Sequence, residues 1–354
     1  MSVTRSSPTT PARRPPSSHL HADPAARRFP AVLIGGLIIV AVLTILHVGV
    51  GPVTLSPRQV VLALIGHPEA PYQRIIVFDL RLPRALIALA AGGMLALAGA
   101  ILQSIMRNPL AEPEMTGSVS GAILITVLWV GFGSSGFVPS VWYAPLIALA
   151  GGVAAGLVVY ALTWRGQSQP GRLILTGLLV SAILRSGASI VLLVNQAAIG
   201  SVMLWLIGSL NGLVWSQWNI LWPWAVPTLA LGLVCARWAN VLQLGDESAV
   251  SLGIRVEWAR AGVLVLAVAV AAGAVAIVGG VVFLGLVAPH LARRITGADA
   301  RRVFPLSIVI GSGLLVGADI LAQVVLPGIQ LPVGAVVAVL GAPFFLYLLR
   351  RRLR

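Results

Sequence analysis

The strongest constraint in this sequence is an apolar run from Ala85 to Ile105, which is rich in Gly and Ala. Two arginines, Arg81 and Arg84, precede the run, and a polar elbow with two prolines, RNPLAEP (107–113), follows it. About 20 apolar residues, each rising about 1.5 Å, cross the hydrocarbon core of a bilayer as a helix. The run therefore predicts a membrane crossing with a basic end and a fixed turn.

Composition extends this prediction to the whole chain. Of the 354 residues, 58% are hydrophobic and 10% are charged, whereas soluble domains carry about 25% charged residues. Because helices satisfy their own backbone hydrogen bonds in lipid, and because the short alternating segments of a barrel are absent, we expect an all-α polytopic membrane protein. The single cysteine, Cys235, lies in an apolar run and excludes an internal disulfide and a Cys-based metal site.

Ten segments of the chain are predicted to be crossings, and both termini are then on the same side of the membrane. Residues 1–30 are rich in Pro, Ser, Thr and Arg, so we expect a disordered cytoplasmic tail; residues 31–354 form one transmembrane domain. Ser56, followed by Pro57, has the pattern of a helix start outside these crossings. The expected crossings are about 31–50, 85–105, 117–130, 144–164, 173–194, 220–237, 263–278, a short one ending at 291, 303–326 and 333–349.

The charge distribution sets the predicted orientation. The formal net charge is +14, and all 24 basic residues are arginine. With both termini cytoplasmic, 19 arginines lie on the cytoplasmic side, one (Arg185) lies within the membrane, and four lie outside, as the positive-inside rule expects. The arginines are scattered, which favours loops facing anionic lipid over nucleic-acid binding. The four outer arginines either reach lipid headgroups or dock an acidic partner: Arg58, Arg74, Arg81 and Arg84.

The sequence offers one weak match to a catalytic motif, at residues 133–136. The sequence has no GxxxxGK[ST] loop for nucleotide phosphates, no HExxH and no Cys/His cluster. The segment 133–136 (GSSG) resembles the motif of intramembrane serine proteases, but a serine nucleophile needs a nearby base. The only histidine in a late crossing, His290, is expected at the opposite face, so a turn is the favoured interpretation of GSSG.

The longest polar segment between crossings contains GDESAVSLG (245–253). Acidic residues at positions 246 and 247 suit a helix N-terminus and Gly253 suits its end. This segment is either a solvated loop or a short amphipathic helix that fits a groove on a cytoplasmic partner.

Several long motifs, in order along the chain, resemble those of the iron-chelate/cobalamin permease family, the membrane subunits of ABC importers for iron–siderophore complexes, haem and vitamin B12. The resemblance covers about residues 31–354. The motifs are RLPRALIAL (81–89), RNPLAEPEMTG (107–117), WLIGSLNG (205–212), GDESAVSLGI (245–254), FLGLVAPHLAR (283–293) and LPVGAVVAVLGAPFFLYLL (331–349).

The resemblance implies a permease with the fold of the vitamin B12 importer permease, in the cytoplasmic membrane of a prokaryote. It implies a homodimer, or a heterodimer with a similar permease, bound to two ATPase subunits and to an extracytoplasmic substrate-binding protein. ATP and Mg would be bound by the ATPase, and this chain would be no enzyme and would hold no cofactor, metal or nucleic acid. Iron–siderophore complexes are the favoured substrate; haem and vitamin B12 remain open, and an ATP-independent secondary transporter is the competing class.

The resemblance also implies roles for individual residues. Arg81 and Arg84 would dock the binding protein, although Gln323 stands where the family has a further arginine. Gln169 to Gly171 departs from the small hydroxyl residues expected of a cobalamin permease. Arg185 either faces the pathway or pairs internally, and for His290 and Asp319 structural hydrogen bonding is favoured. The expected cytoplasmic gates are Asn108, Leu110, Pro170 and Gly171, and the expected contacts to the ATPase, within a coupling helix at about 245–257, are Gly245, Asp246, Glu247, Ala249, Leu252 and Gly253.

Overall fold

The computed structural model describes residues 24–51, 53–132, 144–163, 170–194, 203, 205–326 and 328–352, and these residues form helices and connections without a strand. The helices are α1 (Pro24–Gly49), α2 (Pro57–Leu64), α3 (Pro71–Arg74), the π-helix η1 (Ile75–Arg81), α4 (Leu82–Ile105), the 3-10 helix η2 (Pro113–Thr116), α5 (Ser118–Phe132), α6 (Ala144–Thr163), α7 (Pro170–Val194), α9 (Trp215–Val234), α10 (Ala236–Gln243), α11 (Asp246–Ser251), α12 (Val256–Val278), α13 (Leu284–Thr296), α14 (Ala300–Val324) and α15 (Val333–Arg352).

The expected all-helical membrane fold is confirmed, and a helix coincides with each of the ten expected crossings. Within the described part of the chain, six helices are long and apolar enough to cross a bilayer, and α9 with α10, bent by 43°, would be a seventh. The apolar parts of α5 and α15 are shorter, and α13 has 13 residues. The bundle therefore combines full crossings with shorter helices.

Two boundaries differ from the sequence prediction. Residues 24–30 belong to α1, so the expected disordered tail of residues 1–30 is too long; residues 1–23 lie outside the described part. The second crossing begins earlier, because α3 and η1 continue into α4 and make a helix over Pro71–Ile105.

The predicted helix start at Ser56 is confirmed, since the Ser56 side chain accepts a hydrogen bond from the Gln59 backbone and the Gln59 side chain accepts one from the Ser56 backbone.

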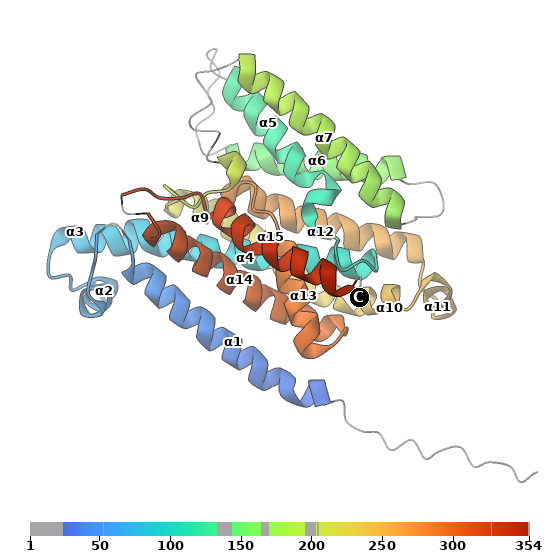
Figure 1. Cartoon of the computed structure of the whole chain (residues 1–354), viewed down its shortest axis with the longest axis horizontal. Helices are drawn as coiled ribbons and strands as arrows, with labels where there is room; N and C mark the ends of the chain where they lie inside the picture. The colour runs from blue at the N-terminus through green and yellow to red at the C-terminus, as the bar shows by residue number, and fades with distance from the viewer. Residues whose placement is uncertain are drawn as a thin grey trace, which may run out of the picture.

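The centre of the bundle is α4, which packs against α14, α12, α13 and α9 (Figure 1). Close packing there depends on glycine. A Cβ on Gly99 would lie 1.8 Å from the carbonyl oxygen of Gly285, and one on Gly92 would lie 2.5 Å from that of Gly311. In lipid, helices associate largely through such close backbone contact, so these glycines bring α13 and α14 against α4.

The remaining helices surround this centre. One side is formed by α5, α6 and α7, with α12 packed between α6 and α4, and α1 lies on the opposite side against α14 (Figure 1). Apolar side chains of α1 such as Ile38, which is 58% exposed, point away from the bundle toward lipid. The short helices α2 and α3 lie at one end of the molecule, and α10 and α11 lie at the other.

Candidate functional site

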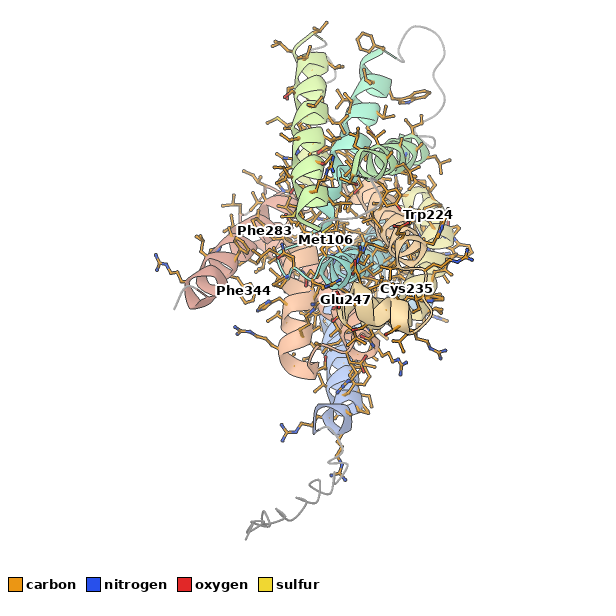
Figure 2. All side chains as sticks on the ribbon, turned by 90° about the vertical axis from the view of Figure 1, so that its right-hand side faces the viewer. Met106, Trp224, Cys235, Glu247, Phe283 and Phe344 are labelled. Carbon is orange, nitrogen blue, oxygen red and sulfur yellow. The ribbon has the colours of Figure 1, made fainter. Side chains whose placement is uncertain are left out.

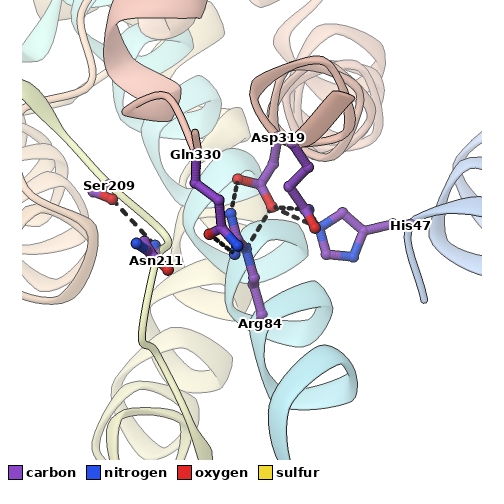
Figure 3. Close-up of polar contacts among 7 residues, drawn as sticks. His47, Arg84, Ser209, Asn211, Asp319 and Gln330 are labelled. Carbon is purple, nitrogen blue, oxygen red and sulfur yellow. Dashed lines mark hydrogen bonds and ion pairs between the residues drawn. The ribbon is translucent and has the colours of Figure 1, made fainter. Parts of the chain in front are cut away.

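A buried polar network ties α1, α4 and α14 together near the α2–α3 end (Figure 3). Arg84 on α4 donates from Nε to Oδ2 of Asp319 at 2.7 Å and from Nη2 to Oδ1 at 2.8 Å. His47 on α1 places Nε2 at 2.6 Å from Oδ2 of the same carboxylate. Gln323 donates to that oxygen at 3.1 Å, and Gln330 accepts from Nη1 of Arg84 at 3.0 Å. The fully buried carboxylate of Asp319 on α14 therefore links this helix to both α4 and α1.

Arg81, at the end of the π-helix, donates hydrogen bonds to backbone carbonyls and not to the Asp319 network. Its Nη1 donates to the carbonyl oxygens of Val48 and Gly49 at 2.9 and 2.8 Å, and its Nη2 donates to that of Val53. These carbonyls lie at and beyond the C-terminal end of α1, where backbone acceptors lack helical partners. Arg81 therefore caps α1.

The two arginines expected to dock a binding protein are thus engaged within this chain. Arg81 is 7% exposed and Arg84 is 8% exposed. Their role in docking stays a prediction, and in this conformation a partner's carboxylate would have to compete with Asp319 for Arg84. Gln323, which replaces an expected arginine, contributes an amide to the same network.

The elbow that follows α4 is a compact turn. Arg107 has a positive φ of 47°, which for residues other than glycine is uncommon. Asn108 accepts the Leu110 amide at its side-chain Oδ1, 3.0 Å away, and the Ala111 amide at its backbone oxygen, 3.1 Å away. The turn continues into η2 and ends at Gly117, whose φ is +77°. Two expected gate residues, Asn108 and Leu110, therefore belong to one hydrogen-bonded turn.

The polar segment after α10 contains the expected short helix, α11, and it is joined to the elbow. Asp246, its first residue, accepts from Nη2 of Arg260 at 2.7 Å through Oδ1, and the same oxygen accepts from Nη2 of Arg107. Partial burial alone would raise the pKa of Asp246, but the hydrogen bonds and positive charges of Arg260 and Arg107 outweigh it and lower this pKa below its ordinary value.

Around α11 the surface carries apolar side chains between polar ones. Leu244, Val250, Leu252 and Trp258 are between 62% and 68% exposed, while Ala249 is buried in a cluster with Leu242 and Val256. Glu247 is exposed at this end of the molecule, which faces the viewer in Figure 2. Gly253, with φ +77°, follows the helix end. Exposed apolar side chains with a polar rim are typical of a protein-binding surface.

Arg185, in the middle of α7, both pairs internally and lines a cavity. Its Nη2 forms an ion pair with Glu114 of η2, and its Nε donates to Ser120 at 3.3 Å. The cavity has a volume of about 360 Å³, lies between α5, α7 and α15, and is lined by apolar residues apart from Arg185 and Ser189. Because a half-exposed arginine is costly in lipid, this face of α7 is unsuited to direct lipid contact.

The other residues predicted from the sequence lie outside these polar clusters. Pro170 and Gly171 are the first residues of α7, far along the chain from the elbow, and GSSG (133–136) lies outside the described residues. His290 packs edge-on against Phe344, with ring centroids 6.2 Å apart. Cys235 is buried and donates to the Gly232 carbonyl. Among the described residues, no group of three His, Cys, Asp or Glu side chains could hold a metal ion.

Four ionisable residues of these clusters were not singled out as site residues from the sequence. His47 gave one signal, since it is a polar residue within an apolar run. Glu114 and Arg107 stood in recognised motifs, and Arg260 stood at a helix start, but sequence separation conceals their partners. Their pairing depends on how distant helices pack.

The all-helical bundle is that of the permease subunits of ATP-binding cassette (ABC) importers, which are multi-pass membrane proteins. A solved structure described as an inward-facing conformation of a metal-chelate type ABC transporter has a TM-score of 0.78 against this chain, at 26% identity, over 91% of this chain and 99% of that one. The chain belongs to the FecCD transport family, whose family model matches residues 38–351.

The sequences of curated relatives align with this chain over most of their length. The iron(3+)-hydroxamate import system permease protein FhuG of Bacillus subtilis (strain 168) is 38% identical over 326 residues, which are 89% of this chain and 95% of that protein. The Fe(3+) dicitrate transport system permease protein FecD of Escherichia coli (strain K12) is 40% identical over 309 residues, 86% of this chain and 93% of that protein. The expected family is therefore confirmed.

Proposed function

We propose that this chain is the membrane-spanning subunit through which an ABC importer moves iron–siderophore complexes across the cytoplasmic membrane. Relatives named for ferric hydroxamate and ferric dicitrate support the iron-chelate assignment. Hemin and cobalamin are the alternative substrates of the same mechanism, since permeases named for them in Yersinia pestis and Halobacterium salinarum are 34% and 37% identical to this chain.

The observation that carries the proposal is the surface around α11. Its exposed apolar side chains, with Glu247 beside them, suit insertion into a groove of a soluble partner. We assign this groove to an ATPase subunit that binds ATP and Mg, while this chain supplies no catalytic residue or cofactor. The α11 end is then cytoplasmic, with both termini, and the α2–α3 end faces an extracytoplasmic binding protein.

The exposed face of α7 supports the proposal of a dimer. Arg185 is 49% exposed on its side chain, and Ser186 and Ser189 share that face. A polar face within the bilayer needs a protein or aqueous neighbour. A second permease subunit, identical or similar, would enclose the pathway there, with Arg185 within reach of an anionic chelate. The cytoplasmic gates of this pathway would be formed by Asn108, Leu110, Pro170 and Gly171.

Uptake into proteoliposomes tests the function. The permease, its ATPase and its binding protein are reconstituted, and ATP-driven uptake of a ferric siderophore, hemin and cobalamin is compared. We expect uptake of the ferric siderophore that requires ATP and all three components. Uptake that persists without the ATPase would contradict the ABC mechanism and favour a secondary transporter. Uptake of hemin alone, or of cobalamin alone, would show that this compound is the substrate and that the iron–siderophore assignment is wrong.

The α11 surface is tested by ATPase binding. Leu252→Arg places a charge on the apolar surface, so we expect the permease to lose at least tenfold in ATPase capture in a pull-down. Glu247→Arg reverses a charge there and should weaken capture too. Leu64→Arg makes the same kind of change on α2, at the opposite end of the molecule (Figure 1), and should bind the ATPase normally. Equal capture by all variants would exclude α11 as the contact.

A further inference from the structure

A single carboxylate joins α11 to the elbow after α4. Oδ1 of Asp246 accepts from Arg260 on α12 at 2.7 Å and from Arg107 in the elbow. The Arg260 side chain is 9% exposed and fixes one end of this link within the bundle. The three charged groups therefore join three segments of the chain at one point.

The backbone on both sides supports this contact. Arg107 reaches α11 from a left-handed conformation, φ +47°, which it shares with only one other non-glycine residue in the described part of the chain, Phe283. Such a conformation persists where its surroundings hold it and is concentrated at functional positions. Gly245, at φ +112°, precedes Asp246, and a Cβ there would lie 3.9 Å from Nη1 of Arg107.

From the elbow the contacts continue to α7. The carbonyl oxygen of Met115 lies so close to α7 that a Cβ on Gly177 would be 1.7 Å from it. Glu114, the neighbouring residue, pairs with Arg185 of the same helix, and Ser181 donates to the Glu114 carbonyl at 3.2 Å. The elbow therefore contacts α7 through the Met115 carbonyl, the Glu114 side chain and the Glu114 carbonyl.

We propose that Asp246 is a positioning residue that makes α11 and the elbow, residues 107–117, move as one body, so that motion of α11 reaches the gate turn and α7. The inference rests on the proposed function and deepens it, because it names the contact through which the ATPase would control the pathway. Energetic coupling between distant sites is carried by packed side chains, hydrogen bonds and ion pairs, and here these contacts run through Asp246, Arg107 and Glu114.

The exposure of the link makes it testable. The side chains of Arg107 and Asp246 are 41% and 53% exposed, and ion pairs this exposed contribute little to folding stability. Asp246→Asn and Arg107→Gln should therefore both fold, and Arg107→Gln, which changes none of the expected contacts to the ATPase, should bind the ATPase like wild type. What they should lose is the coupling of hydrolysis to transport, which a merely structural role would leave unchanged.

The experiment measures substrate imported per ATP hydrolysed in the reconstituted complex. Each variant should lower this ratio at least fivefold, and Arg107→Gln, which leaves the expected ATPase contact intact, should do so while the complex hydrolyses ATP at the wild-type rate. Asp299→Asn is the matched control, because Asp299 also accepts hydrogen bonds, from Asn240 and Arg301, and should keep the wild-type ratio. An unchanged ratio in both variants would overturn the link, whereas an absence of uptake by the wild-type complex would refute the proposed function instead.

Two further measurements address the link itself. In the permease alone, Asp246→Asn should raise hydrogen exchange of the Leu110 and Ala111 amides; unchanged exchange would contradict the link whatever the transport result. In a Cys235→Ala background, the double variant Arg107→Cys, Asp246→Cys should be uncoupled. A short bis-methanethiosulfonate cross-linker, which forms a disulfide with each cysteine and releases methanesulfinate, should restore the wild-type ratio until reductant is added. A cross-linked complex that stays uncoupled would also overturn the proposal.

Discussion

At the scale of single residues, Asp319 is the carboxylate on which the polar network between α1, α4 and α14 converges. It is fully buried, and Arg84, His47 and Gln323 all bond to it. Breaking a buried ion pair by removing one partner is far more damaging than replacing both partners, because the remaining charge loses its compensation. The structural role favoured for Asp319 from the sequence agrees with these contacts.

Asp319→Asn should therefore destabilise the permease by about 3–5 kcal/mol and lower Tm by roughly 5 to 10 °C, because it leaves Arg84 buried without a counter-charge. Thermal unfolding in detergent, followed by tryptophan fluorescence, measures the shift. Asp79→Asn changes an exposed aspartate on η1 and should melt like wild type. The paired replacement Arg84→Met, Asp319→Leu should recover part of the loss, and equal melting of Asp319→Asn and wild type would contradict this assignment.

At the scale of elements, glycine determines how close α4 and its neighbours lie. The contact of Gly99 with Gly285 leaves no space for a methyl group, whereas a Cβ on Gly317 of α14 would meet nothing within 4 Å. The two positions look alike in sequence, since each is a glycine in an apolar helix.

Their alanine variants should differ in sign. Gly99→Ala must separate α4 from α13 and should cost about 1–3 kcal/mol, as overpacking does, while Gly317→Ala should be neutral or stabilising by up to about 1 kcal/mol through helix propensity. Chemical unfolding of the two variants in the same detergent makes the comparison. A neutral Gly99→Ala would show that the two helices can move apart freely.

Sequence reasoning located the elements better than their contacts. Hydropathy placed all ten apolar helices, because burial in lipid depends on local composition. It missed the separate helix α10 and the π-helix before α4, which depend on backbone geometry. It proposed Arg81 and Arg84 as surface groups, because a sequence does not show that Asp319, 235 residues after Arg84, lies beside it. The α11 helix was predictable from its acidic start and its closing glycine, but its bond to Arg107 was not.

At the scale of the whole molecule, one face of α7 is incompatible with surrounding lipid. Arg185, Ser186 and Ser189 are exposed there, beside the cavity shared with α5 and α15. The proposed dimer would enclose this face, and α1, with its apolar exposed side chains, would remain in lipid.

Cross-linking tests this arrangement. In a Cys235→Ala background, Ser186→Cys in membranes should give a covalent dimer with a short bis-maleimide, which adds one cysteine thiol at each end, because the same residue of both subunits would line a shared pathway. Ile38→Cys on α1 is the control and should stay monomeric. The reverse result, dimers through α1 and none through α7, would place the subunit interface on the other side of the bundle.

The network around Asp319 also constrains how the molecule is made. Arg84 and its counter-charge are 235 residues apart, so at synthesis rates of about 5–20 residues per second, roughly 10 to 50 s separate their emergence from the ribosome. During that interval α1 and α4 are present with Arg84 lacking its carboxylate. The α2–α3 end of the bundle can close only when α14 has been inserted, so its assembly is one of the last steps in biogenesis.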